Sequence, residues 1–219
     1  MMLSYNTLMA NRTKIVSTAW THNFAYAVGL IASDGNLSPD LRHINITSKD
    51  REMLVMMKDI LKLENKIGRK ARGGSKMKKY YVLQFGSKNF FEFLLSIGLT
   101  PAKSKTMNAL LIPDLYFLDF FRGCMDGDGN INEFQHPESA QIQLRIGLSS
   151  ASKEFLLWVH KKIRTLNTVR GGWIDKRPYK SVYTLRFGKQ DSIKIMQAMY
   201  HSKARYFLKR KHKTATTYL

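Results

Sequence analysis

The feature of this sequence that most constrains its fold is an internal duplication. When the chain is laid on itself with an offset of 102 residues and no gaps, residues 44–86 match residues 146–188 at ten positions. The segment YVLQFG in the first copy corresponds to YTLRFG in the second. Repetition of this kind predicts two structural units of the same type in one chain. We expect an N-terminal half over 1–106 and a C-terminal half over 107–219.

Both halves carry the same expected order of helices and strands. Apolar residues at helical spacing follow the capping candidates Thr21 and Asn23, and Gly35 stands where a C-terminal glycine ends a helix. Alternation of apolar and polar residues then predicts strands. The expected helices lie at about 24–34, 50–63, 89–98, 116–128, 152–166 and 192–201, and the strand regions at 43–47, 66–86, 141–148 and 168–188. This is an α+β chain, αββαββα twice.

A large excess of positive charge indicates a polyanionic partner. The chain has 36 Lys and Arg against 16 Asp and Glu, a net charge of +20, and nucleic acid is the leading partner for such a balance. Residues 66–80 contain seven basic and no acidic side chains. The matching hairpin of the second half is also basic, with aromatic residues interleaved. Because alternate strand residues share a face, two such hairpins predict a pseudo-twofold saddle of antiparallel sheets for the major groove of duplex DNA.

The expected contacts with double-stranded DNA follow from this arrangement. No obligate protein partner is expected, and the protein should be a monomer, because one chain already contains both halves. The residues expected to contact DNA are Asn36, Lys66, Arg69, Lys70, Arg72, Lys76, Lys78, Gln84, Asn130, Gln141, Gln143, Arg145, Arg170, Lys176, Lys180 and Arg186.

Composition excludes several other classes of protein. Apolar residues make up 44% of the chain, enough to fill a core, yet the longest apolar stretch near the first helix, 24–32, is far shorter than the roughly 20 residues of a membrane span. Residues 1–20 lack the continuous apolar segment of a secretory signal, so we expect an intracellular protein. One cysteine, Cys124, allows neither an internal disulfide nor a multi-thiolate metal site. The six histidines show no spacing typical of metal ligands.

An acid ends the first expected helix of each half. Asp34 and Asp128 are each followed by glycine and asparagine, and a carboxylate at a helix C-terminus costs about 0.3–1 kcal/mol at an exposed site. A compensating partner is therefore expected. Small residues four apart predict that the two helices pack closely, which would bring both acids together. Paired oxygen ligands suit Mg²⁺, which assists phosphodiester hydrolysis. The small residues are Ala25, Gly29 and Ser33 on one helix and Gly123 and Gly127 on the other.

The segments AVGLIASDG and FRGCMDGDG resemble the two motifs of the single-chain LAGLIDADG homing endonucleases. The resemblance implies cleavage of both strands of a long, pseudo-palindromic DNA site, leaving 3′ overhangs. It implies that Asp34 and Asp128 bind Mg²⁺, with Mn²⁺ or Ca²⁺ able to occupy the sites, and that the carbonyls of Ser33 and Gly127 also serve as ligands. The chain departs from the motif at Ala32, where the family often has an acid, and at Ser33; we expect activity to survive.

The same resemblance implies a basic residue near each scissile phosphate. The segments AKSKT and KRKHKT fit that location, so Lys103 and Lys211 are the candidate catalytic lysines, with Lys105 and Lys213 as alternatives. Ser48 and Ser150 match the region where a polar residue holds solvent near the metals, and we include them among the expected contacts.

Two other interpretations of the sequence are a calcium-binding protein and a nucleic-acid-binding protein that does not cleave. DGDGNIN is similar to the start of a calcium-binding EF-hand loop, but Ile131 and Pro137 occupy positions that need glycine and glutamate. Related folds also serve as RNA maturases of introns or as DNA-binding regulators without cleavage. Retention of both acids favours the nuclease, which would be intron-encoded or free-standing and would act in the cytoplasm or organelle that carries the host intron.

Overall fold

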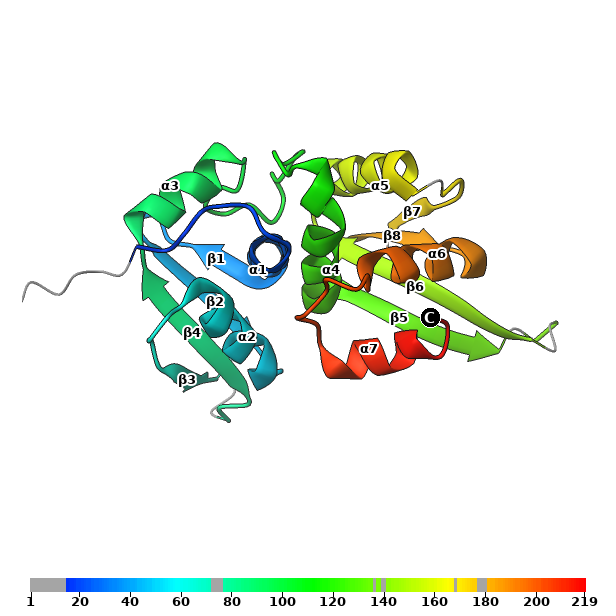
Figure 1. Cartoon of the computed structure of the whole chain (residues 1–219), viewed down its shortest axis with the longest axis horizontal. Coiled ribbons are helices and arrows are strands. Elements are labelled where there is room, and N and C mark those ends of the chain that lie inside the picture. Colours follow the sequence, from blue (N-terminus) through cyan, green and yellow to red (C-terminus); the bar gives the residue numbers. More distant parts are fainter. Residues whose placement is uncertain (1–14, 72–76, 136, 139–140, 168, 177–180) are drawn as a thin grey trace, which may run out of the picture.

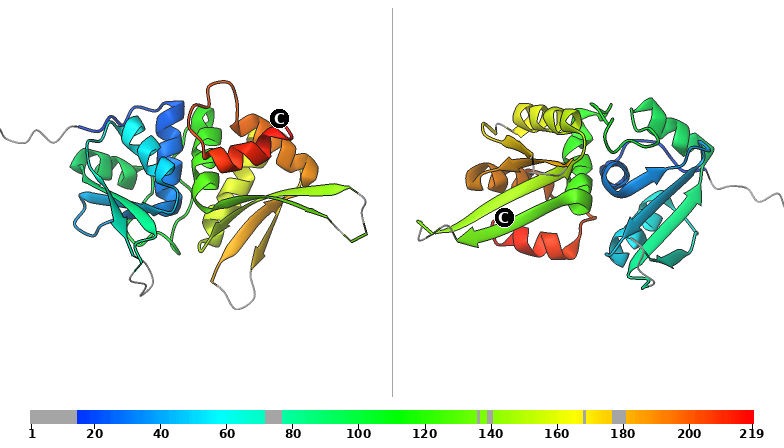
Figure 2. Two further views of the ribbon diagram at one scale, coloured as in Figure 1. Left: turned by 90° about the horizontal axis from the view of Figure 1, so that it is seen from below. Right: turned by 180° about the vertical axis from the view of Figure 1, so that it is seen from behind.

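Each half of the chain forms a four-stranded antiparallel sheet covered by helices on one face (Figures 1 and 2). The computed structural model describes residues 15–71, 77–135, 137–138, 141–167, 169–176 and 181–219. The elements of the first half are α1 (His22–Asp34), β1 (Gly35–Leu37), β2 (His43–Ser48), α2 (Arg51–Leu61), β3 (Ile67–Lys70), β4 (Tyr80–Gly86) and α3 (Lys88–Ser96). Those of the second are η1 (Asp114–Tyr116), α4 (Phe117–Asp128), β5 (Gly129–Gln135), β6 (Ile142–Ser150), α5 (Lys153–Asn167), β7 (Trp173–Lys176), β8 (Tyr183–Phe187), α6 (Lys189–Met199) and α7 (Lys209–Thr216).

The sheet registers repeat between the halves. The strand orders are β1-β2-β4-β3 and β5-β6-β8-β7, and all neighbours are antiparallel. Ile44 faces Phe85 in the first sheet, and Ile146 faces Phe187 in the second, which is the same pair at the offset of 102. The predicted fold class, αββαββα twice, is confirmed. Helix α7 has no helical counterpart, because 101–106 forms turns.

Helix α1 begins and ends for local reasons. The Thr21 hydroxyl accepts a hydrogen bond of 3.0 Å from the Phe24 amide, so Thr21 is the N-cap, whereas Asn23 lies inside the helix. Gly35 ends α1, but our expectation of a typical C-terminal glycine, which is left-handed, is wrong: its φ of −78° and ψ of 144° lead straight into β1. Glycine is required because a Cβ there would lie 2.6 Å from the Ile31 carbonyl oxygen.

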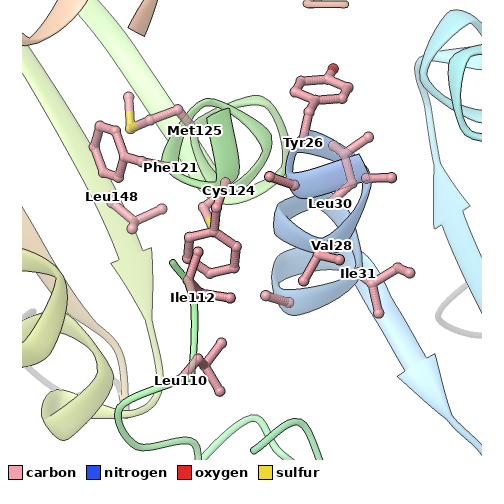
Figure 3. Close-up of a cluster of buried hydrophobic side chains, with 14 of the residues drawn as sticks. Tyr26, Val28, Leu30, Ile31, Leu110, Ile112, Phe121, Cys124, Met125 and Leu148 are labelled. Carbon is pink, nitrogen blue, oxygen red and sulfur yellow. The ribbon is translucent and has the colours of Figure 1, made fainter. Parts of the chain in front are cut away.

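Helices α1 and α4 lie side by side at the centre of the molecule (Figures 1 and 3). A Cβ on Gly29 would lie 2.0 Å from the Phe120 carbonyl oxygen, and one on Gly123 would lie 2.2 Å from that of Tyr26. The two backbones therefore touch at a pair of glycines, as the small residues predicted. Apolar side chains pack around the helix pair (Figure 3). The buried side chains there include Leu30 and Ile31 of α1, Phe121, Cys124 and Met125 of α4, and Leu148 of β6.

The start of α7 contacts the first half. The Lys209 amide donates to Glu52 at 3.3 Å, and Arg210 forms an ion pair of 2.9 Å with Asp50, both near the start of α2. Helix α7 thus spans both halves. In the described parts of the chain, no helix has the length and apolar character needed to cross a membrane.

Candidate active site and DNA-facing surface

The two acids lie at one end of the central helix pair and face a common cavity. Asp34 and Asp128 are the last residues of α1 and α4, and both line a polar cavity of about 470 Å³. A Cβ on Gly127, the residue before Asp128, would lie 3.2 Å from Asp34 Oδ2. The contact between the glycines is what allows this approach. The other lining residues are Ser33, Gly35, Asn36, Leu37, Asn45, Thr47, Lys70, Thr100, Ala102, Lys103 and Ser104.

Lys103 is a buried cation in this cavity. The residue is 6% exposed, and Nζ donates a hydrogen bond to the Gly35 carbonyl. Burial lowers the pKa of Lys103 to about 8, although the attraction of Asp128 and Asp34 acts in the opposite direction. Lys105, its alternative from the sequence, is exposed. Of the two candidate lysines in this segment, Lys103 is therefore the one that is buried at the cavity.

Lys211 occupies the matching position in the second half but in a different environment. Nζ donates to the carbonyls of Met125 (2.5 Å), Gly129 (2.7 Å) and Asp126 (2.9 Å), at the end of α4. Gly129 corresponds to Gly35 in the first half. Burial also lowers the pKa of Lys211 to about 8, against the attraction of Asp126. Unlike Lys103, Lys211 is not among the described residues that line the cavity. Its alternative, Lys213, is exposed.

Asp126 was not expected to contribute to the site, and the structure buries it. The Tyr26 hydroxyl and the Leu208 amide each donate to its Oδ2 at 2.8 Å, and burial raises the pKa of Asp126. Asp126 corresponds to Ala32 in the first half. It joins α1, α4 and the connection before α7, so it positions the segment that carries Lys211.

The proposed backbone ligands lie beside the acids. Ser33 lines the cavity, and its hydroxyl donates to the Gly29 carbonyl at 3.1 Å. Gly127 lies against this hydroxyl, because a Cβ there would come within 2.1 Å of Ser33 Oγ. A side chain at position 127 would therefore push the two acids apart.

The sheet register assigns the expected DNA contacts to faces. In each sheet the buried residues of the central strands face the helices, so the residues that alternate with them lie on the opposite, open face. The expected contacts on the open face are Asn36, Lys70, Gln84, Asn130, Gln143, Arg145 and Arg186. Lys66, Lys78 and Gln141 are exposed just outside the strands.

Several expected contacts lie elsewhere. Arg69 and Lys176 lie on the helix-covered face, over the rings of Tyr81 (4.5 Å) and Tyr183 (5.8 Å). Arg170 lines a groove beside α5. Ser48 and Ser150 are the last expected contacts that the structure describes. Their hydroxyls accept hydrogen bonds of 3.1 Å from the backbone amides of Asp50 and Ser152. Outside the described residues lie Arg72, Lys76 and Lys180.

Sequence reasoning missed part of the open face. Arg145 lies between the rings of Phe134 (4.9 Å) and Trp173 (5.2 Å). Nearby, Asp175 accepts from Arg186 Nε at 2.8 Å. In the first sheet, Asn45 and Thr47 line the cavity beside the acids. The alternation in residues 43–48 would have placed both on the open face.

The fold is that of the LAGLIDADG homing endonucleases, and the comparison with solved structures supports this over most of the chain. The structure of homing endonuclease I-DmoI in complex with DNA and Ca matches 89% of this chain and 97% of its own, with a TM-score of 0.60 and 19% identity. Meganuclease I-SmaMI bound to uncleavable DNA matches 90% of each chain, with a TM-score of 0.59 and 13% identity.

A third solved structure that matches this chain is not described as an endonuclease. Full-length DUF199/WhiA from Thermatoga maritima matches 92% of this chain, with a TM-score of 0.56 and 14% identity. The match covers 61% of the WhiA chain, and a related structure is described as its N-terminal LAGLIDADG domain. No protein-family profile and no curated protein sequence matches this chain.

Proposed function

We propose that the protein is a site-specific homing endonuclease that makes a metal-dependent double-strand break in DNA. The observation that carries the proposal is the convergence of Asp34 and Asp128 on one polar cavity that also contains the buried ammonium of Lys103. The two acids occupy matching positions in the two halves of a duplicated chain, so each could act on one of the two antiparallel strands of a DNA duplex. We assign one strand to each acid and expect 3′ overhangs.

The residues at the cavity fit a hard divalent cation. Carboxylate and carbonyl oxygens are the ligands that Mg²⁺ prefers, and Asp34, Asp128 and the carbonyls of Ser33 and Gly127 would hold it. When bound, Mg²⁺ would stabilise the negative charge that develops on the phosphodiester during hydrolysis. Similar proteins have been solved with Ca, with Mn and with Mg.

The chain's own side chains would position the DNA and supply fixed charge. With a pKa of about 8, Lys103 is mostly protonated at pH 7, so it would place a positive charge beside a phosphate in the cavity. The open faces of the two sheets would contact the two halves of a long, pseudo-palindromic site in the major groove. The N-terminal half, 1–106, and the C-terminal half, 107–219, would each contact one half of the DNA site, so one copy of the chain would cover the whole DNA site.

Selection from a randomised DNA library tests this function. The protein is incubated with duplexes and Mg²⁺, and cleaved sites are sequenced. Each of the variants Asp34→Asn and Asp128→Asn is expected to lose double-strand cleavage of the selected site and to retain binding measured in Ca²⁺. Asp114→Asn is the matched control, because Asp114 is an exposed acid of η1 that pairs with Lys162.

The alternatives give different results in the same experiment. The match to WhiA supports a DNA-binding regulator as the second candidate, and binding of DNA without metal-dependent cleavage would favour it. Tight binding of structured RNA in preference to duplex DNA would favour a maturase. Loss of binding in both acid variants would show that Asp34 and Asp128 support the fold rather than the chemistry.

A further inference from the structure

Three potential metal ligands converge at the end of the α1–α4 pair opposite to the two acids. His22 is the first residue of α1, Asp119 lies in the first turn of α4, and His201 follows α6. Their ligand atoms all lie within 4.8 Å of one another. Within the described parts of the chain, this is the one such group of three or more His, Cys, Asp or Glu side chains.

The geometry suits a tetrahedral cation after a small adjustment. His22 Nδ1 lies 2.7 Å from Asp119 Oδ2, and His201 Nε2 lies 3.1 Å from Asp119 Oδ1. In a tetrahedral zinc site with bonds of about 2.0–2.1 Å, ligand atoms are about 3.3 Å apart. His22 would therefore have to move about half an ångström away from Asp119, and the three ligand atoms, which lie within 4.8 Å of one another, would have to adopt this spacing. The two imidazole side chains are 24% and 27% exposed, so a cation can enter and water can complete its coordination.

The surroundings hold two of the ligands in place. Asp119 is 1% exposed, and its Oδ1 accepts a hydrogen bond of 2.7 Å from the fully buried guanidinium of Arg122. Arg122 therefore orients the carboxylate, as outer-shell donors do for ligating carboxylates. The ring of Tyr116 packs edge-on against His22 at 5.3 Å.

We propose that His22, Asp119 and His201 form a structural binding site for a transition-metal cation, with Zn²⁺ as the expected ion. Imidazole and carboxylate ligands together favour Zn²⁺ over Mg²⁺. His22 belongs to the first half, and Asp119 and His201 belong to the second, so the cation links the halves. The charge of Arg122 repels it, which makes the site weaker than one with four protein ligands. The proposal does not depend on the proposed DNA cleavage.

Thermal unfolding of the full chain with ZnCl₂ or MgCl₂ tests the site. At a hundredfold excess of Zn²⁺ over its Kd, we expect the Tm to rise by about 5–10 °C, and Mg²⁺ at the same concentration should not reproduce this rise. His22→Gln and His201→Gln should each abolish it. His43→Gln is the matched control, because His43 also pairs with an aspartate, Asp40, at 2.5 Å but belongs to no group of three ligands among the residues that the structure describes.

Two further measurements separate this site from the acids and from misfolding. The double variant Asp34→Asn, Asp128→Asn should keep the full Zn²⁺ response. Co²⁺ bound to the wild-type chain should give the visible absorption of a tetrahedral site with nitrogen and oxygen ligands, and both histidine variants should lose it. The proposal is overturned if Zn²⁺ does not stabilise the wild type, or if both histidine variants keep the response.

Discussion

Replacement of Lys103 by methionine should stabilise the protein while removing the proposed cleavage activity. Burial lowers the pKa of this lysine from an ordinary 10.5 to about 8, which corresponds to a cost of about 3 kcal/mol for holding the charged form in the fold. Lys103→Met removes that cost and keeps a chain of similar length. It also removes the hydrogen bond to the Gly35 carbonyl, worth about 1 kcal/mol. The variant should therefore be about 2 kcal/mol more stable at pH 7.

The effect should depend on pH in a defined direction. The folded protein releases the Lys103 proton near pH 8, whereas the unfolded chain keeps it to about pH 10.5. Between these values the unfolded state binds more protons, so the free energy of unfolding of the wild type rises with pH. The variant lacks this contribution. Its advantage should be complete below pH 8 and should disappear as the pH approaches 10.5.

Urea denaturation of both proteins at pH 7 and pH 10 measures this difference. Lys105→Met is the matched control, because Lys105 lies in the same segment and is exposed; it should change stability by less than about 0.5 kcal/mol. A Lys103→Met variant that is less stable than the wild type at pH 7, or whose advantage does not change with pH, would refute the reasoning.

Two other predictions follow from the helix contact and the open face. Gly29→Ala should lower the free energy of unfolding by about 3 kcal/mol, because the new methyl group would lie 2.0 Å from the Phe120 carbonyl oxygen; Gly188→Ala, with nothing within 4 Å, is the control in the same urea titration. Arg145→Ala should weaken binding to the selected DNA site by about 1–3 kcal/mol and relax its base preference. Lys176→Ala, on the helix-covered face, should leave that preference unchanged, as measured by competition between duplexes; equal effects of the two would contradict the assignment of faces.

The order of elements could be predicted because the pattern is local and occurs twice. Alternation over residues 43–48 and helical spacing over α1 depend only on neighbouring residues. The sequence could not predict which basic residues of the hairpin lie on the open face. Basic residues stand at both odd and even positions of the strand, so the alternation does not favour either face. Arg69 and Lys70 differ by one position, yet the register puts Lys70 on the open face and Arg69 on the other.

The two lysine segments show a second limit. KSKT and KHKT are almost identical, but the first lies in turns and the second in α7. Contacts from other parts of the chain decide the difference: Asp126 accepts the Leu208 amide just before α7, and Asp50 holds Arg210 within it. The first half has Ala32 in place of Asp126. Likewise, His22 and Asp119 are 97 residues apart, so no rule of spacing could have paired them.

At positions 29 and 123 the seam between the halves is main chain against main chain. Such a contact does not depend on which side chains each half carries on its outer surfaces, so the open faces of the two halves can change independently in evolution. Only the bonds that cross the seam must change as pairs, such as Tyr26 with Asp126 or His22 with Asp119. A chimera of halves from two proteins should fold when these pairs travel with the glycines.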